Sequence, residues 1–163
     1  MRRSDVVEKK IVSLPVLTRL VAQWRLLGKK IAFTNGIFDI LHKGHIFSLS
    51  QAASEADYLI VGLNSDSSTK MLKGETRPIN DEQSRALLLA SLLIVDAVVI
   101  FNEETPLELI KAILPDVIIK GGDYTVEQVA GGKEVIENGG RVVINPIIEG
   151  LSTTGLIQKI ERL

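Results

Sequence analysis

Both histidines of the chain, His42 and His45, lie in the stretch FTNGIFDILHKGH, residues 33–45, with Gly44 between them. The apolar residues before this stretch indicate a strand, and HKGH would open the helix that follows. A helix N-terminus has unpaired N–H groups and a partial positive charge, which suit an anion. Gly44 lets a phosphate approach the backbone, and imidazoles at positions i and i+3 share one helix face. The stretch therefore predicts a phosphate-binding corner.

Two other interpretations of the histidines stay open at this point. A zinc or iron ion could use both imidazoles, but its further ligands would be carboxylates such as Asp39, because the chain has no cysteine. The rings could also be structural and satisfied by backbone groups. Neither of the common phosphate loops, G-x-G-x-x-G after the first strand or G-x-x-x-x-G-K-[ST], occurs in the sequence.

The composition limits the classes of function. The chain has 163 residues, is 45% hydrophobic and carries 19 Lys plus Arg against 20 Asp plus Glu, a formal net charge of −1. This balance gives no overall field that would attract nucleic acid or an anionic membrane. The N-terminus lacks the apolar core of a secretory signal, and the most apolar segment, residues 86–95, is too short to span a bilayer. We therefore expect a cytoplasmic protein without nucleic-acid or membrane partners.

Strand and helix signals alternate along the chain. Near-continuous apolar runs predict strands of a parallel sheet at residues 31–34, 58–63, 97–101, 117–119 and 141–144. Helices are expected at residues 15–27 and 81–93, with Asn80 and Gln83 as a capping pair for the second. Thr105 is expected to cap the next helix and Ser152 or Thr153 the last. The pattern predicts a single doubly wound, Rossmann-like α/β domain of about five parallel strands with helices on both faces.

Small and polar residues follow every predicted strand. In an open parallel sheet, ligands bind beyond the carboxyl ends of the strands, so these loops are expected to line one cleft. The segments are Asn35-Gly36, Asn64-Ser65-Asp66, Asn102-Glu103, Lys120-Gly121-Gly122-Asp123 and residues 145–154.

Taken together, these segments resemble a known family. TNGIFDILHKGH (34–45), Asn64-Ser65-Asp66, the pair Arg85 and Asp96, and GLSTTGLIQK (150–159) are similar to signatures of the HxGH nucleotidyltransferases, the cytidylyltransferase-like superfamily. Its enzymes join a nucleoside triphosphate to a phosphate ester. LKGETRP (72–78), LPDVIIKGGDY (114–124) and GGKEVIENGG (131–140) resemble one branch, the adenylyltransferases of ADP-heptose synthesis. Ile37, Leu151 and Gly155 depart from the usual pattern.

The resemblance covers the chain from about residue 29 onward. It implies a nucleotidyltransferase domain at residues 29–163, preceded by an N-terminal extension and helix at residues 1–28. The reaction it implies is a direct attack by D-glycero-D-manno-heptose 1-phosphate on the α-phosphorus of ATP, which gives ADP-heptose and pyrophosphate for lipopolysaccharide core or a related glycan. Mg²⁺ is expected to accompany ATP, with Asp39 or Asp66 as its ligand.

The resemblance also implies roles for individual residues. The predicted catalytic residues are His42, His45, Lys73 and Lys159. Predicted nucleotide contacts are Thr34, Asn35, Gly36, Phe38, Gly44, Lys120, Gly121, Asp123, Tyr124, Ser152, Thr153 and Thr154. Predicted sugar-phosphate contacts are Asp39, Asn64, Asp66 and Arg77.

Partners and rival functions complete the expectations. In many bacteria such a domain is fused behind a sugar kinase. The 28 residues before the first predicted strand are too few for one, so the chain is expected to be either a stand-alone enzyme or an excised domain, with functional coupling to a separate heptose kinase. The apolar segment 86–95 predicts a contact between two copies in a homodimer. A cytidylyltransferase acting on glycerol 3-phosphate and a non-catalytic nucleotide sensor are the alternative functions.

Overall fold

A computed structural model describes residues 4–122, 124–146, 152–160 and 162 of the chain. Its centre is a five-stranded sheet in the order β3-β2-β1-β4-β5, and every neighbouring pair is parallel. The strands are β1 (Ile31–Gly36), β2 (Tyr58–Asn64), β3 (Ala97–Phe101), β4 (Val117–Gly121) and β5 (Arg141–Asn145). The chain moves outward from β1 to β3, then crosses to the other side of β1. The strand order therefore reverses beside β1, which is where a ligand cleft is expected.

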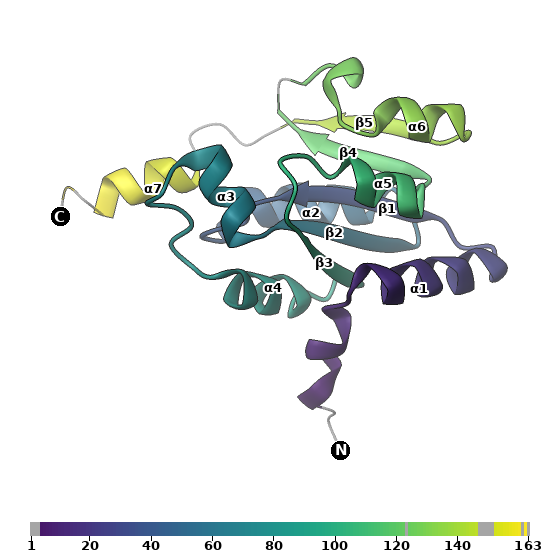
Figure 1. The fold of residues 1–163 in the computed structure, drawn as a ribbon, viewed down its shortest axis with the longest axis horizontal. Helices are drawn as coiled ribbons and strands as arrows, with labels where there is room; N and C mark the ends of the chain where they lie inside the picture. The colour runs from purple at the N-terminus through teal and green to yellow at the C-terminus, as the bar shows by residue number, and fades with distance from the viewer. Residues whose placement is uncertain (1–3, 123, 147–151, 161, 163) are drawn as a thin grey trace.

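Helices cover both faces of this sheet, as the sequence predicts (Figure 1). They are α1 (Leu14–Leu26), α2 (Lys43–Ala53), α3 (Asp66–Lys73), α4 (Glu82–Ala90), α5 (Leu107–Ile113), α6 (Gly132–Glu137) and α7 (Thr153–Ile160). Short 3-10 turns lie at Ser4–Val6, Glu8–Lys10 and Val126–Gln128. No helix of the described residues is long and apolar enough to cross a membrane.

Two apolar clusters fix the helices to the sheet. On one face, Leu17 of α1, Ile110 of α5 and Val135 of α6 pack with strand residues such as Phe33 and Ile118. The opposite face holds Leu49 and Ala52 of α2 and Ala86 and Leu89 of α4, against strand residues that include Ala32 and Val117. Each cluster buries its side chains almost completely, and burial of a large aliphatic side chain contributes about 1.5–3 kcal/mol. The loops at the strand ends are thereby held on a rigid frame.

The residues before β1 belong to this frame. The helix predicted at residues 15–27 is confirmed as α1, with Pro15 in its first turn. Leu17 and Val21 of α1 are buried against the sheet, and the backbone of Ile11 forms an isolated bridge with Val98 of β3.

Several local predictions are wrong at their boundaries. Asp81, and not Asn80 with Gln83, caps α4, because its carboxylate accepts a hydrogen bond from the backbone N–H of Ser84 at 2.9 Å. The side chain of Asn80 is engaged elsewhere, since its amide donates to the backbone oxygen of Asp39 at 2.7 Å. Thr105 makes no capping hydrogen bond, whereas the Ser152 hydroxyl caps α7 by accepting from the N–H of Gly155 at 3.0 Å.

The apolar segment 86–95 is only partly helical. Helix α4 ends at Ala90, and a turn follows before β3 begins. Ala86, Leu89 and Ala90 are buried, but Leu93 is 93% exposed, and Leu87 and Leu88 are also exposed. The prediction of a helix through residue 93 is therefore wrong at its end, and three of its large apolar side chains, those of Leu87, Leu88 and Leu93, are exposed.

Candidate active site

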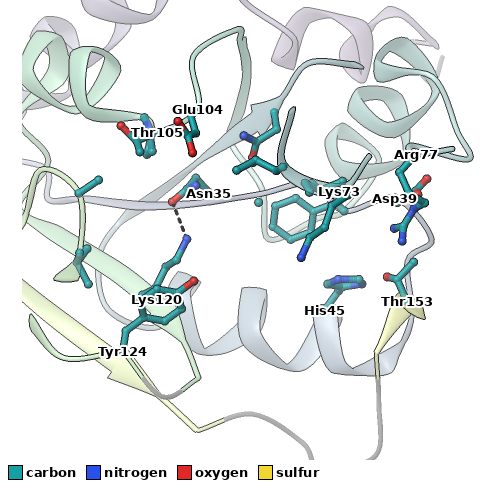
Figure 2. A pocket seen from close by; sticks show the side chains of 18 of the residues that line it. Asn35, Asp39, His45, Lys73, Arg77, Glu104, Thr105, Lys120, Tyr124 and Thr153 are labelled. Atoms are coloured by element: carbon teal, nitrogen blue, oxygen red, sulfur yellow. Dashed lines mark hydrogen bonds and ion pairs between the residues drawn. The ribbon is translucent and has the colours of Figure 1, made fainter. Parts of the chain in front are cut away.

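A cavity of about 520 Å³ opens at the carboxyl ends of the strands, beside β1 and β4 (Figure 2). Its walls come from the ends of β1, β2 and β4, the loops that flank α3 and precede α5 and α6, and the start of α7. The single cleft that the sequence predicts at this edge is thus present. The lining residues are Asn35, Gly36, Ile37, Phe38, Asp39, His45, Asn64, Leu72, Lys73, Arg77, Glu104, Thr105, Pro106, Lys120, Tyr124, Gln128, Val129, Ala130, Thr153 and Thr154.

Most of the predicted site residues line this cavity, but several do not. Asn35, Gly36, Phe38, Asp39, His45, Asn64, Lys73, Arg77, Lys120, Tyr124, Thr153 and Thr154 lie on its wall. The residues that do not line it are Thr34, His42, Gly44, Asp66, Gly121, Ser152 and Lys159. Asp123 falls outside the described residues. The side chain of Lys159 is exposed in the last turn of α7, far along the helix from Thr153.

Sequence reasoning missed part of the wall. Glu104, Thr105 and Pro106 lie one to three residues beyond the polar pair that follows β3, and they enter the cavity as the loop turns into α5. Their position after a strand could have identified them. Gln128, Val129 and Ala130 precede α6, far in sequence from any strand end, and no signal in the sequence marks them.

The two histidines form a fixed pair at the start of α2. His42 is the N-cap residue, and its Nδ1 accepts a hydrogen bond from the N–H of Gly44 at 3.1 Å. In return, Nδ1 of His45 accepts from the backbone N–H of His42 at 3.4 Å, and the rings stack with centroids 3.9 Å apart. Because both Nδ1 atoms accept, we assign the proton of each neutral ring to Nε2. Each histidine therefore presents an Nε2–H donor.

Only part of the structural interpretation of these rings holds. Backbone N–H groups satisfy the Nδ1 atoms, but Nε2 of His42 is buried and has no partner among the described residues. An unpaired buried donor is costly, and a ligand oxygen would relieve that cost. As for a metal centre, the described residues contain no group of three His, Cys, Asp or Glu side chains that could hold an ion.

Burial keeps both imidazoles neutral near neutral pH. It lowers the pKa of His42. The pKa of His45 falls from 6.5 to about 4 through burial and, to a lesser degree, through the charge of His42, against an opposing backbone hydrogen bond at Ile40. The pair consequently offers directed N–H donors rather than positive charge. A bound phosphate would favour the protonated rings and raise both pKa values.

Asp39 is tied into the wall rather than left free for a ligand. Its side chain is fully buried, and it accepts hydrogen bonds from Nε of Arg77 at 2.7 Å and from the backbone N–H groups of Ile79 and Asn80 at 2.9 Å. Burial on its own raises the pKa of Asp39, but the bonds from Asn80, Ile79 and Arg77 outweigh it and lower the pKa overall. Both carboxylate oxygens are thus committed, which disfavours the predicted roles in binding Mg²⁺ or a sugar.

Asp66 is likewise engaged, by the fully buried side chain of Arg85. The guanidinium donates to Asp66 at 2.7 Å and to the backbone oxygens of Ile37, Asn64 and Asn80 at 2.7–2.9 Å. These acceptors belong to the loop after β1, the end of β2 and the loop before α4. Asp66 lies outside the cavity wall, so the structure assigns it to positioning these loops.

Cationic side chains enter the cavity from separate loops. Lys73 ends α3 and is followed by Gly74, whose φ of 91° lets the chain turn back at once. Arg77 is held by Asp39, and Lys120 donates to Oδ1 of Asn35 at 3.2 Å. Thr153 and Thr154 add hydroxyls at the N-terminus of α7, so that two helix N-termini border the same space. The site can hold more than one phosphate group in a fixed arrangement.

Comparisons with known proteins agree with this arrangement. Residues 33–159 match the model of a family described as cytidylyltransferase-like. The chain is 54% identical over 153 residues to the bifunctional protein HldE of Caulobacter vibrioides, and 54% identical over 154 residues to that of Koribacter versatilis. Each match covers 94% of this chain and 32% of the relative, so the chain spans about a third of these curated proteins.

Solved structures extend the likeness. A lipopolysaccharide core biosynthesis protein from Thermoplasma volcanium superposes with a TM-score of 0.60 at 30% identity, over 74% of this chain and 97% of that protein. A pantoate-beta-alanine ligase from Francisella tularensis gives a TM-score of 0.61 over 94% of this chain and 78% of its own. Its identity is 17%, so it supports the fold alone.

The network of Asp39 predicts how stability depends on pH. Because the folded-state pKa of Asp39 lies below its ordinary value of 3.8, its contribution is present above that value and is lost as pH falls through the folded pKa. We expect Asp39→Asn to lower the free energy of unfolding by about 3 kcal/mol near neutral pH, and by less in acid. Urea unfolding between neutral pH and acid measures this difference.

The control for that measurement is Glu137→Gln, which changes an exposed carboxylate of α6 whose nearest cation, on Lys133, is 3.8 Å away. Its stability should follow that of the wild type at every pH. If Asp39→Asn were as stable as the wild type and its stability depended on pH in the same way, the stabilising role of the hydrogen bonds to Asp39 would be contradicted.

The histidine pair predicts an NMR titration. Without ligand, the His45 ring should titrate with a pKa of about 4 and the His42 ring below 6.5. ATP should raise both values, because phosphate stabilises the charged rings, whereas adenosine, which has no phosphate, should leave them unchanged. Ordinary titration of His45 near 6.5 without ligand would contradict the geometry.

Proposed function

Because the chain belongs to the cytidylyltransferase-like family and is a nucleotidyltransferase, we propose that it makes ADP-heptose from ATP and D-glycero-D-manno-heptose 1-phosphate. The observation that carries the proposal is the cavity itself. There the His45 imidazole, the N-termini of α2 and α7 and the cations Lys73, Arg77 and Lys120 converge. Such a site suits two phosphate-bearing substrates that must meet despite their mutual repulsion.

The choice of sugar rests on similarity. Identity of 54% with the HldE proteins supports the adenylyltransferase branch that the motifs at residues 72–78 and 114–124 resemble. The neighbouring structure is named for lipopolysaccharide core biosynthesis, which is consistent with a heptose product. The curated relatives are called bifunctional, and this supports coupling to a second activity, which we propose is a heptose kinase. We place the reaction in the cytoplasm, where ATP is available.

The proposed reaction is a single displacement. An oxygen of the sugar phosphate forms a bond to the α-phosphorus of ATP, and the bond from that phosphorus to the oxygen bridging to the β-phosphorus breaks. Pyrophosphate leaves with the bonding electron pair. His45 would donate Nε2–H to an oxygen on which charge accumulates, His42 would hold the N-terminus of α2 in place as its N-cap, and Lys73 would add positive charge. These donors are fixed before the reaction by the cap of α2, so little reorganisation is needed.

Mg²⁺ is proposed to arrive with ATP. The described residues offer no group of three side chains that would hold it, and Asp39 and Asp66 already accept hydrogen bonds from Arg77 and Arg85. Phosphate oxygens would therefore hold the ion, which neutralises charge on the triphosphate.

Pyrophosphate release tests the proposed function. Wild-type protein with Mg²⁺ should release pyrophosphate from ATP only with the heptose 1-phosphate, and removal of Mg²⁺ by a chelator should abolish release. His45→Ala should lower kcat/KM by about 10²–10³-fold, the usual cost of one transition-state donor. Lys133→Ala, at an exposed site on α6, serves as the control.

Other outcomes of that assay separate the alternatives. Release with CTP and glycerol 3-phosphate would keep the reaction type and overturn the substrates. Tight ATP binding without release for any acceptor would indicate a nucleotide sensor, and the catalytic roles of the histidines would then be wrong.

We also propose that the protein forms a homodimer through the exposed apolar residues of α4 and of the turn that follows it. Leu93 is 93% exposed and lies close in sequence to the exposed Leu87 and Leu88. Sedimentation should therefore show a dimer that Leu93→Glu dissociates, whereas Leu26→Glu, at an equally open site 87% exposed on α1, should not dissociate it. A monomer at high protein concentration would contradict this proposal.

A further inference from the structure

Lys120 presents a positive charge that the described residues do not neutralise. Its ammonium donates to Oδ1 of Asn35 at 3.2 Å and lies 5.3 Å from the ring centroid of Tyr124. No ion pair to Lys120 occurs within the described part of the chain, in contrast to Arg77 and Arg85, which each face a carboxylate. Burial lowers the pKa of Lys120 below 10.5. A partly buried ammonium of this kind becomes more stable when an anion binds to it.

The pleat of the sheet places this charge on one side of the cavity. Ile118 of β4 pairs with Phe33 of β1, and both belong to the cluster under α1, α5 and α6. Side chains alternate along a strand, so Lys120 and Asn35, two residues further on, face the same side. The histidines sit on α2, which packs on the opposite face. Figure 2 shows Lys120 beside Asn35 and Tyr124, with His45 and Thr153 together elsewhere on the wall.

The absence of a side chain at one neighbouring position supports this placement. Gly62 of β2 pairs with Asn35, and a Cβ at Gly62 would lie 2.8 Å from the Phe33 ring and 3.3 Å from Cβ of Asn35. Glycine at this position leaves room for the Asn35 side chain. That side chain in turn holds the ammonium of Lys120 above the end of β1.

The geometry of displacement at phosphorus indicates which side of the cavity holds the leaving pyrophosphate and which side holds the attacking phosphate. The attacking and leaving oxygens must lie in line on opposite sides of the α-phosphorus. The N-termini of α2 and α7, with the Nε2–H donors, suit the leaving pyrophosphate. The attacking phosphate then has to approach from the other side, where Lys120 provides the positive charge.

Other lining residues favour a hydroxylated group over a second polyphosphate. Thr105 and Gln128 line the cavity with a hydroxyl and an amide, and Figure 2 shows Thr105 and Glu104 on the same side of the view as Asn35. Glu104 adds a carboxylate, which repels phosphate but accepts hydrogen bonds from sugar hydroxyls. A sugar phosphate with its phosphate at Lys120 and its sugar toward the loop before α5 would give the ammonium an anion and would give the polar side chains hydroxyl groups to bind.

We propose that Lys120 binds the phosphate of the incoming sugar 1-phosphate, and that it is thus an acceptor-binding residue and not the nucleotide contact that the sequence predicts. The sugar hydroxyls face Glu104 and Gln128. The inference rests on the proposed function, because it takes the acceptor to be a sugar phosphate and the displacement to be in line.

Affinities of the two substrates, measured separately, test the inference. Calorimetry with α,β-methylene-ATP reports the nucleotide site, and the KM of heptose 1-phosphate in the pyrophosphate assay reports the acceptor site. Lys120→Met should raise that KM by at least about tenfold and leave the Kd of the nucleotide analogue within about twofold, since the lost charge faces only the acceptor. Lys111→Met, which removes an exposed lysine paired with Glu108 on α5, is the matched control and should change neither.

A pH profile separates a charge contact from a merely structural role. In the wild type, the KM of heptose 1-phosphate should rise as pH increases through the lowered pKa of Lys120, because the neutral amine no longer attracts phosphate. Lys120→Arg keeps its charge throughout this range, so its KM should show no such rise.

Each contrary result is decisive. The assignment of Lys120 would be overturned if Lys120→Met left the KM of heptose 1-phosphate unchanged, or if it weakened nucleotide binding as much as it raised that KM. In either case, wild-type activity with heptose 1-phosphate would leave the proposed function intact. If the wild type used a different phosphate ester, the proposed sugar would be wrong. The same variant would then test Lys120 with that ester, and an unchanged KM would overturn the inference there too.

Discussion

The guanidinium of Arg85 is the interaction on which the cleft depends. It is fully buried and joins the backbone oxygens of Ile37, Asn64 and Asn80 with the carboxylate of Asp66. A buried charge is costly unless it is paired and hydrogen-bonded, so these four acceptors favour the arrangement of the loops that surrounds the guanidinium. The loop that receives Arg85 at Asn80 also supplies the N–H groups that hold Asp39. The walls beyond β1 and β2 are therefore set by buried charge pairs rather than by apolar packing.

The pairing of these buried charges determines the sign of the electrostatic potential in the cavity. Its central acidic residue, Asp39, is paired with Arg77, and Asp66 is paired with Arg85 behind the wall. What faces the interior is the neutral imidazole of His45, two helix N-termini, the carboxylate of Glu104 and the ammonium groups of Lys73 and Lys120. The chain as a whole has a net charge of −1, so attraction for phosphate is local to this edge of the sheet. Positioned donors of this kind favour charge that develops during a reaction.

The sequence predicted the features that depend on neighbouring residues. Apolar runs located all five strands, and the motif at residues 42–45 located the start of α2, because both signals are local. The fate of Asp39 could not be predicted, since its partners lie about 40 residues away. Arg85 was identified only through its resemblance to a family signature, and its burial follows from how the loops close over α4. Lys120 was predicted to contact the nucleotide, but the side of the cavity on which it lies depends on the pairing of β4 with β1.

In the proposed reaction, one cleft aligns two phosphates for a direct transfer, with no adenylyl group held on the protein. The stereochemistry at the α-phosphorus tests it most directly. One diastereomer of adenosine 5′-O-(1-thiotriphosphate) would be reacted with D-glycero-D-manno-heptose 1-phosphate, and the configuration of the product would be determined by phosphorus NMR. A single in-line displacement predicts inversion. Retention would require two successive displacements through a covalent adenylyl-protein, and it would rule out direct transfer between the two substrates.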